Sequence, residues 1–273
     1  MYIWNELSLP NGKKAGWETM VGEDLAVNSP STTLYVPLEF WFCRNVGLAL
    51  PLIALQYHEV KINLDFETKE NMLRSGNAAS IDDMSSASLW VDYIFLDTDE
   101  RRRFAQLSHE YLIEQLQFTG DESLTSDNNR VKLNFNHPCK ELIWVARLDD
   151  RATGNDWINF TDASGTSNIT TRAKLQLNGH DRFAERDGNY FNLVQPFQHH
   201  ENVPTNEGIN VYSFALKPEE HQPSGTLNMS RIDTAVLNLT AALHAEKGVL
   251  KVFAVNYNVL RIMSGMGGLA YSN

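Results

Sequence analysis

The chain has 273 residues, enough for one large all-β domain or two domains of ordinary size. Hydrophobic residues make up 42% of it, and no stretch approaches the roughly 18 consecutive apolar residues of a membrane-spanning helix, so membrane insertion is not expected. The formal net charge of −11 argues against direct nucleic-acid binding, because an acidic surface repels phosphates.

The first third of the chain combines an irregular beginning with dense strand patterns. Residues 1–33 predict a surface loop with at most one short helix, and no secretory signal is recognisable there. Aromatic and branched residues then predict three strands, Leu34–Cys43, Val60–Phe66 and Leu89–Leu96. Gly47–Leu55 is apolar on all sides and predicts a buried connection, whereas the polar residues 67–88 predict a long loop.

The most charged run of the chain, Asp97–Arg103, predicts a domain boundary. Asp97 and Glu100 have the spacing of a capping box, in which two side chains bond the free N–H groups at the start of a helix. We therefore expect a short helix to about Leu107, followed by a strand, Tyr111–Phe118. The predicted domains are 1–97 and 98–273.

The second domain is predicted to consist of short strands and polar connections. Its further strands are expected at Val131–Asn136, Glu141–Arg147, Lys174–Asn178, Ile209–Leu216, Ala235–Leu243 and Val249–Ile262. Val249–Ile262 is apolar on both faces, as in a central strand that is covered on both sides. Asn178-Gly179 tolerates positive φ and predicts a tight turn. About eight strands with few helical periods indicate an antiparallel sandwich or jelly roll.

The residue spacing does not indicate a catalytic or metal site. None of the eight histidines stands at i, i+2 or i, i+4 from another, and His199 and His200 would point to opposite faces of a strand. Ser224-Gly225 and Ser264-Gly265 lack the frame of a nucleophile turn. We therefore expect no enzymatic activity, no metal and no cofactor.

Two cysteines and two asparagines are the remaining candidate sites. Cys43 and Cys139 are far apart and predict two buried free thiols rather than a disulfide or a zinc site. Asn159 and Asn168 fit the acceptor pattern for N-glycosylation within a polar segment, so glycans are expected there if anywhere.

Seven stretches point to one protein family. They are Gly47–Val60, Trp90–Asp97, Asn178–Phe183, Tyr190–Asn192, Tyr212–Pro218, Gln222–Thr226 and Asn256–Tyr271. In this order they resemble the major capsid proteins of nucleocytoplasmic large DNA viruses, and those of the algal-virus branch most of all. The resemblance runs from about Tyr35 to Asn273, and such long runs are far more specific than a short motif.

The resemblance implies an all-β double jelly roll of the viral capsid type. The chain would be a structural protein that forms homotrimers with a pseudo-hexagonal outline, and these capsomers would tile the icosahedral shell of a virion. Its partners would be other copies, neighbouring capsomers, minor capsid proteins and possible glycans, after synthesis in the host cytoplasm. Residues 1–97 would be the C-terminal part of an incomplete first roll, and 98–273 a complete second roll.

The missing strands of the first roll lead us to expect that the sequence is a partial reading of a longer chain. Burial of one large apolar side chain is worth roughly 1.5–3 kcal/mol, against about 5–15 kcal/mol for the stability of a whole domain. The side chains that would lose their cover are Phe40, Phe42, Ile62, Leu64 and Phe66.

Two loops, Asp149–Ser167 and Asn189–Pro204, are expected to form the tower of the capsomer or the contacts between subunits. A carbohydrate-binding or carbohydrate-active jelly roll is the alternative, because the chain has 13 Phe, 9 Tyr and 6 Trp and many Asn and Asp residues in its loops. Trp157, in the first of these segments, would then be a candidate sugar contact.

Overall fold

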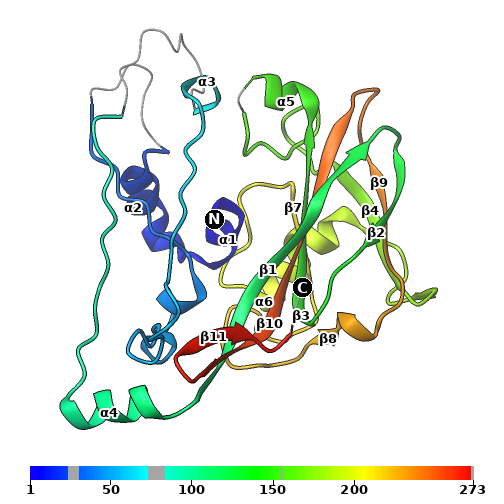
Figure 1. The fold of residues 1–273 in the computed structure, drawn as a ribbon. Coiled ribbons are helices and arrows are strands. Elements are labelled where there is room, and N and C mark those ends of the chain that lie inside the picture. The colour runs from blue at the N-terminus through cyan, green and yellow to red at the C-terminus, as the bar shows by residue number, and fades with distance from the viewer. Residues whose placement is uncertain (24–30, 73–83, 155, 272–273) are drawn as a thin grey trace. The chain divides into compact units, whose positions relative to one another are not determined.

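The computed structural model describes residues 1–23, 31–72, 84–154 and 156–271 (Figure 1). The chain divides into two units, of which the larger comprises Met1–Pro37 and Glu114–Tyr257. The smaller unit comprises Leu38–Ile113 and Asn258–Asn273. No helix among the described residues has the length and apolarity needed to cross a bilayer.

Two antiparallel sheets build the larger unit, one in the order β1-β10-β3-β7 and the other in the order β2-β9-β4-β5 (Figure 1). The strands are β1 (His109–Leu124), β2 (Asn128–Leu133), β3 (Pro138–Leu148), β4 (Thr170–Leu177), β5 (His180–Asp181), β6 (Arg186–Asp187), β7 (Ile209–Ser213), β8 (Leu227–Asn228), β9 (Ala235–Ala241) and β10 (Gly248–Met263). The first strand pairs with the last long one and the second with β9, and this nested pairing is typical of a jelly roll.

Apolar side chains of both sheets meet in one main core. Trp144 of β3 and Leu175 of β4 are each 1% exposed and belong to it. The neighbouring residue Ile143 faces the opposite side of its sheet, where it packs with Leu7 of α1 (Tyr2–Ser8). The sheet that contains β3 is therefore covered on both faces, which explains the long apolar run in that strand.

The strand predictions for the second domain are confirmed by elements that overlap each predicted range. β10 lies between β1 and β3, as expected for a central strand that is apolar on both faces. Asn178 and Gly179 have φ of 51° and 81° and connect β4 to β5 by a two-residue turn, with Leu177 opposite His180. These predictions succeeded because each strand packs on a core, and the side chains that face a core are apolar at alternate positions.

The capping box is also confirmed, at the start of α4 (Thr98–Gln106) in the smaller unit. The Asp97 carboxylate accepts the N–H groups of Asp99 and Glu100, at 2.9 and 2.8 Å. The Glu100 carboxylate in turn accepts the N–H of Asp97 at 3.1 Å. These local contacts need no tertiary partner, so the sequence pattern suffices to predict them.

The prediction for residues 1–33 is wrong, because two helices form there, α1 and α2 (Asn11–Val21). Leu7 is fully buried against the sheet, and this burial stabilises a helix of only seven residues. Gly22 ends α2 with φ of 83°, a left-handed conformation that glycine adopts without a steric penalty.

The three strands predicted over Leu34–Cys43, Val60–Phe66 and Leu89–Leu96 are wrong as well. The described residues of this part form only short helices, η1 (Trp41–Cys43), η2 (Val46–Leu48) and α3 (Lys69–Met72). Strand propensity depends on a neighbouring strand, and none is paired with these segments among the described residues.

A strand does form near the end of the smaller unit's second segment. It is β11 (Met266–Leu269), which pairs with β10.

The connections of this part and of the larger unit also differ from expectation. Gly47–Leu55 is only partly buried, since Leu52 is 49% exposed, and part of the predicted loop 67–88 lies outside the described residues. The connections of the larger unit contain helical turns, including those within Asn189–Pro204. These turns are α5 (Asp149–Thr153), η4 (Tyr190–Val194), α6 (Gln195–His199) and η5 (Met229–Arg231).

Candidate functional site

A buried histidine joins three segments of the larger unit. His200 follows α6, and its side chain is fully buried. Its Nε2 lies 2.8 Å from Oε2 of Glu141 on β3, and its Nδ1 lies 2.8 Å from Oε1 of Glu219. Both ring nitrogens face carboxylate oxygens, so the ring carries two protons and is a cation. Burial alone would lower the pKa of His200, but the Glu141 charge and the hydrogen bonds to Glu141 and Glu219 raise it to about 9.

A second buried ion pair holds the residues that follow Glu219. Lys140 Nζ lies 2.6 Å from Glu114 Oε1, and the two side chains are 1% and 6% exposed. The same ammonium donates to the Glu220 carbonyl at 3.2 Å and lies 5.0 Å from the centre of the Tyr257 ring. Burial raises the pKa of Tyr257 to about 12, so its hydroxyl stays protonated and donates to the His221 carbonyl at 2.9 Å. Glu220 and His221 are thus attached to strands of the sheet, and Glu219 is attached through His200.

The sequence analysis missed this cluster and was wrong about the two adjacent histidines. His199 and His200 lie at the end of α6, not on a strand, and His199 Nδ1 is 3.0 Å from the Leu216 carbonyl. One indication was available in the sequence. Lys140 and Glu141 stand in a strand that is otherwise almost entirely apolar, and buried charges require partners.

The titratable groups of the described residues do not converge on a vacant centre. Within these residues, no group of three or more His, Cys, Asp or Glu side chains is arranged to hold a metal ion. Both cysteines are free, but only Cys139 is buried, so the prediction of two buried thiols is wrong for the exposed Cys43. Burial raises the pKa of the Cys139 thiol well above its ordinary value, which keeps it protonated.

The two candidate glycosylation sites are half-buried, and their amides are engaged. Asn159 Nδ2 donates to Asp156 Oδ2 at 2.8 Å, and Asn168 Nδ2 donates to Asn210 Oδ1 at 2.6 Å. A glycan on either nitrogen would have to replace one of these hydrogen bonds. Glycosylation at Asn159 and Asn168 stays a prediction.

The charged side chain of Arg147 stacks on the ring of Trp157, the candidate sugar contact. The Arg147 guanidinium lies 4.9 Å from the centre of the Trp157 ring, and the residue is 38% exposed. Arg147 Nη1 also donates to the Trp157 carbonyl at 3.4 Å. A sugar that stacked on this face of the ring would have to displace the guanidinium.

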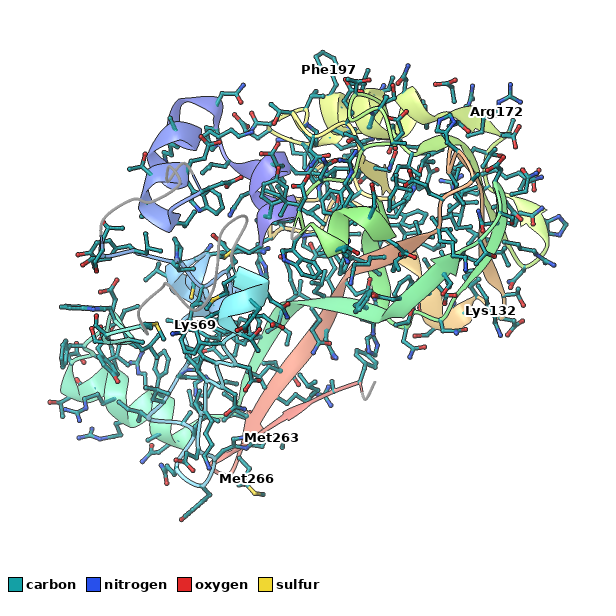
Figure 2. All side chains as sticks on the ribbon, turned by 90° about the horizontal axis from the view of Figure 1, so that it is seen from above. Lys69, Lys132, Arg172, Phe197, Met263 and Met266 are labelled. Carbon is teal, nitrogen blue, oxygen red and sulfur yellow. The ribbon has the colours of Figure 1, made fainter. Side chains whose placement is uncertain are left out.

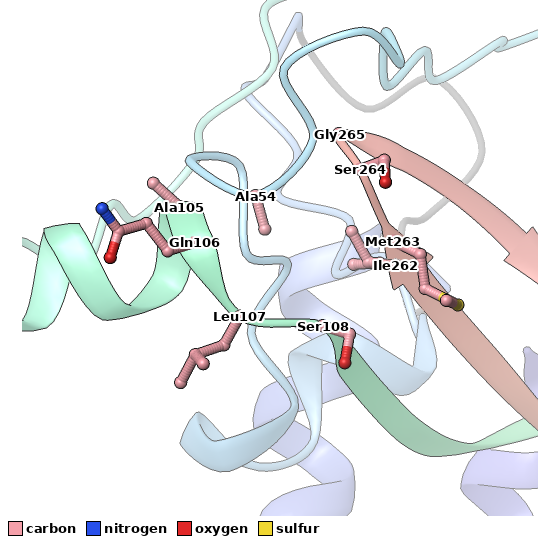
Figure 3. A pocket seen from close by; sticks show the side chains of 9 residues that line it. All are labelled: Ala54, Ala105, Gln106, Leu107, Ser108, Ile262, Met263, Ser264 and Gly265. Carbon is pink, nitrogen blue, oxygen red and sulfur yellow. The ribbon is translucent and has the colours of Figure 1, made fainter.

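A recess of about 420 Å³ lies in the smaller unit (Figure 3). It is lined by Ala54, Ala105, Gln106, Leu107, Ser108, Ile262, Met263, Ser264 and Gly265. None of these side chains is ionisable, so the lining offers no acid, base or charged ligand group.

Two family profiles together match nearly the whole chain. The profile described as "Major capsid protein N-terminus" matches residues 1–97, and the one described as "Large eukaryotic DNA virus major capsid protein" matches residues 100–268. The chain belongs to the major capsid protein family of large eukaryotic DNA viruses. The family predicted from the sequence is therefore confirmed.

Relatives and solved structures agree with this family. The chain is 56% identical to the major capsid protein of Pyramimonas orientalis virus, over 100% of this chain and 72% of that protein. It is 44% identical to that of Phaeocystis pouchetii virus, over 100% of this chain and 77% of that protein. The chain of a quasi-atomic model of the PBCV-1 virus capsid superimposes with a TM-score of 0.77 and 36% identity, covering 100% of this chain and 78% of that chain.

The predicted fold class, an all-β double jelly roll of the viral capsid type, is confirmed by this match and by the antiparallel sheets. The carbohydrate-binding alternative receives no support, because the relatives and structures described above are capsid proteins.

Proposed function

We propose that this chain is a structural subunit of the icosahedral shell of a large DNA virus, in which three copies form a capsomer with a pseudo-hexagonal outline. The proposal rests on the match of the two capsid profiles to residues 1–97 and 100–268, and on the similarity of this whole chain to 78% of a chain of the PBCV-1 virus capsid. Such a subunit acts through its shape and its interfaces, without catalysis.

The partners follow from this role. They are two further copies within the capsomer, neighbouring capsomers and minor capsid proteins, and the subunit would reside in the virion after synthesis in the host cytoplasm. Residues 1–97 would form the C-terminal part of the first roll, and 98–273 the second roll. The two profiles, which meet between residues 97 and 100, support this division.

The architecture of the larger unit suits a shell subunit. Buried charged groups pair with one another inside this unit, as His200 does with Glu141 and Lys140 with Glu114, so they stabilise the fold. The long connections lie outside the sheets, where they are available for contacts with neighbours.

Negative-stain electron microscopy of the purified 273-residue protein tests the proposal. We expect particles with three-fold symmetry at high protein concentration, and a circular-dichroism spectrum of sheet structure would establish that the sample is folded. Folded protein that remains monomeric at every concentration would contradict a trimeric capsomer.

A further inference from the structure

Four asparagines of the chain stand two positions before a serine or threonine, in the acceptor pattern for N-linked sugars. They are Asn159, Asn168, Asn228 and Asn238. The pattern by itself is short, so the fold decides which of them reacts. A folded chain accepts a sugar where the asparagine is exposed, where its Nδ2 is not committed to a hydrogen bond, and where the hydroxyl of the pattern is within reach of an enzyme.

The first two patterns do not meet these conditions. The Nδ2 atoms of Asn159 and Asn168 donate to Asp156 and Asn210, at 2.8 and 2.6 Å. The hydroxyl that belongs to the pattern of Asn168 is that of Thr170, which is 0% exposed. A transferase would reach either asparagine only after a local opening of the fold.

Asn238 lies in the middle of a sheet. It belongs to β9, between β2 and β4, and its Nδ2 donates to Gln176 Oε1 of β4 at 3.1 Å. Exposed cationic side chains stand on both neighbouring strands, among them Lys132 and Arg172 (Figure 2). A sugar on Asn238 would have to break this hydrogen bond and fit between the long side chains of two strands.

Asn228 differs from the other three. It is exposed and ends β8. Its Oδ1 accepts the N–H of Ser230 at 3.1 Å, and no described residue is hydrogen-bonded to its Nδ2. Ser230 is exposed as well, and its Oγ accepts the His137 N–H at 2.9 Å. A hydroxyl that accepts still has its own hydrogen to donate, so it can bind an enzyme.

The residue between Asn228 and Ser230 anchors this turn. Met229 is 2% exposed and belongs to the main core, and its N–H donates to the His137 carbonyl at 3.0 Å. The short helix η5 begins directly after Asn228, whose side chain caps it. The acceptor pattern is therefore held at the surface by a fixed local structure, and it is accessible without unfolding of the larger unit.

We propose that Asn228 is a site for an N-linked sugar on the folded chain, added by a transferase that takes the sugar from a nucleoside diphosphate donor. The bond between Asn228 Nδ2 and C1 of the sugar forms, and the bond between C1 and the diphosphate oxygen breaks with its electron pair on the leaving diphosphate. The proton lost from Nδ2 passes to a base of the transferase. The site lies within one subunit, so it does not depend on the proposed role in a shell.

Incubation of the folded 273-residue protein with UDP-glucose and a soluble N-glycosyltransferase specific for Asn-x-Ser/Thr tests the proposal. Peptide mapping by mass spectrometry should find one hexose per chain, on Asn228. The other three asparagines should react more than about 10-fold more slowly, because each first requires a local opening of the fold. Synthetic peptides that carry each of the four patterns show which of them the enzyme accepts without a fold.

Two matched pairs of variants control the result. Asn228→Gln should remove the modification, whereas Asn159→Gln should leave its rate unchanged. Ser230→Ala should also remove it, whereas Ser230→Thr keeps the hydroxyl and should be modified like wild type. The unfolding temperature of each variant, measured alongside, establishes that it is folded.

Three outcomes would overturn the proposal. The first is an equal rate at Asn228 and at any of the other three asparagines of the folded protein. The second is an Asn228 that is modified in its peptide but not in the folded protein, and the third is an Asn228 that is modified in neither. Because this readout does not involve assembly, a protein that carries the sugar but stays monomeric would contradict the trimeric capsomer alone.

Discussion

Loss of one proton from His200 would leave a ring nitrogen without a hydrogen atom 2.8 Å from a carboxylate oxygen. A neutral imidazole has one donor and one acceptor, so it can satisfy only one of Glu141 and Glu219. The other carboxylate would then face a lone pair, and burial of an unpaired charge is costly. The thiol of Cys139, whose pKa is raised by burial, stays protonated at the pH values at which His200 loses its proton.

This geometry predicts that stability falls at alkaline pH. The pKa of His200 is about 9 in the folded protein and 6.5 ordinarily, so its stabilisation is fully present below about pH 6.5 and is lost as the pH rises through about 9. The loss is on the order of 3 kcal/mol. Calorimetry at pH 7 and pH 10 measures it, and His200→Gln should be less stable at pH 7 and less sensitive to pH. The same pH dependence in both proteins would contradict this role of His200.

At the scale of elements, α1 packs on the larger unit's sheet through Leu7, with Tyr2 and Ile3 against the same cluster. Leu7 is fully buried beside Ile143 and Val145 of β3 and Ile209 of β7. Additional polar contacts fix the end of the helix, because the Glu6 carboxylate accepts the N–H and the hydroxyl of Thr205 at 3.0 and 2.8 Å. The helix therefore protects one face of the sheet from water.

Leu7→Ala should lower the free energy of unfolding by about 2–5 kcal/mol, because it removes buried methyl groups and leaves a cavity against the sheet. Chemical denaturation followed by tryptophan fluorescence measures the change. Leu116→Ala, at a leucine that is 64% exposed, should change stability by less than about 0.5 kcal/mol. Equal effects of the two substitutions would show that α1 does not stabilise the sheet.

The elements also show how far the sequence could be read. Strands β2, β4 and β9 could be predicted because alternate residues of each strand face one core. Helix α4 could be predicted because the hydrogen bonds of its capping box are local. Helix α1 could not be predicted, because its stability comes from the packing of Leu7 on strands that are distant in sequence. The His200 cluster was not predictable either, because Glu141 is 59 residues away in sequence and only the folded sheet brings the two together.

At the scale of the whole molecule, the two units are stabilised differently. The larger unit buries a main core that includes Trp144 and Leu175. In the smaller unit, Trp90 is 87% exposed and Phe95 is 92% exposed, so these large side chains contribute little burial. The apolar pattern that predicted strands is present there, but among the described residues no neighbouring strand pairs with it.

This difference predicts two classes of amide in hydrogen exchange. Amides of Val60–Phe66 and Leu89–Leu96 lack a strand ladder among the described residues, so they should exchange close to the unfolded rate. Those of β9, bonded to β2 on one side and β4 on the other, open only with the larger unit and should exchange more than about 1,000-fold more slowly. Exchange followed by mass spectrometry compares both classes within one molecule, so unfolded protein cannot mimic the result. Equal protection of Val60–Phe66 and β9 would mean that Val60–Phe66 pairs with another strand in solution. Its alternating sequence would then have predicted its structure correctly.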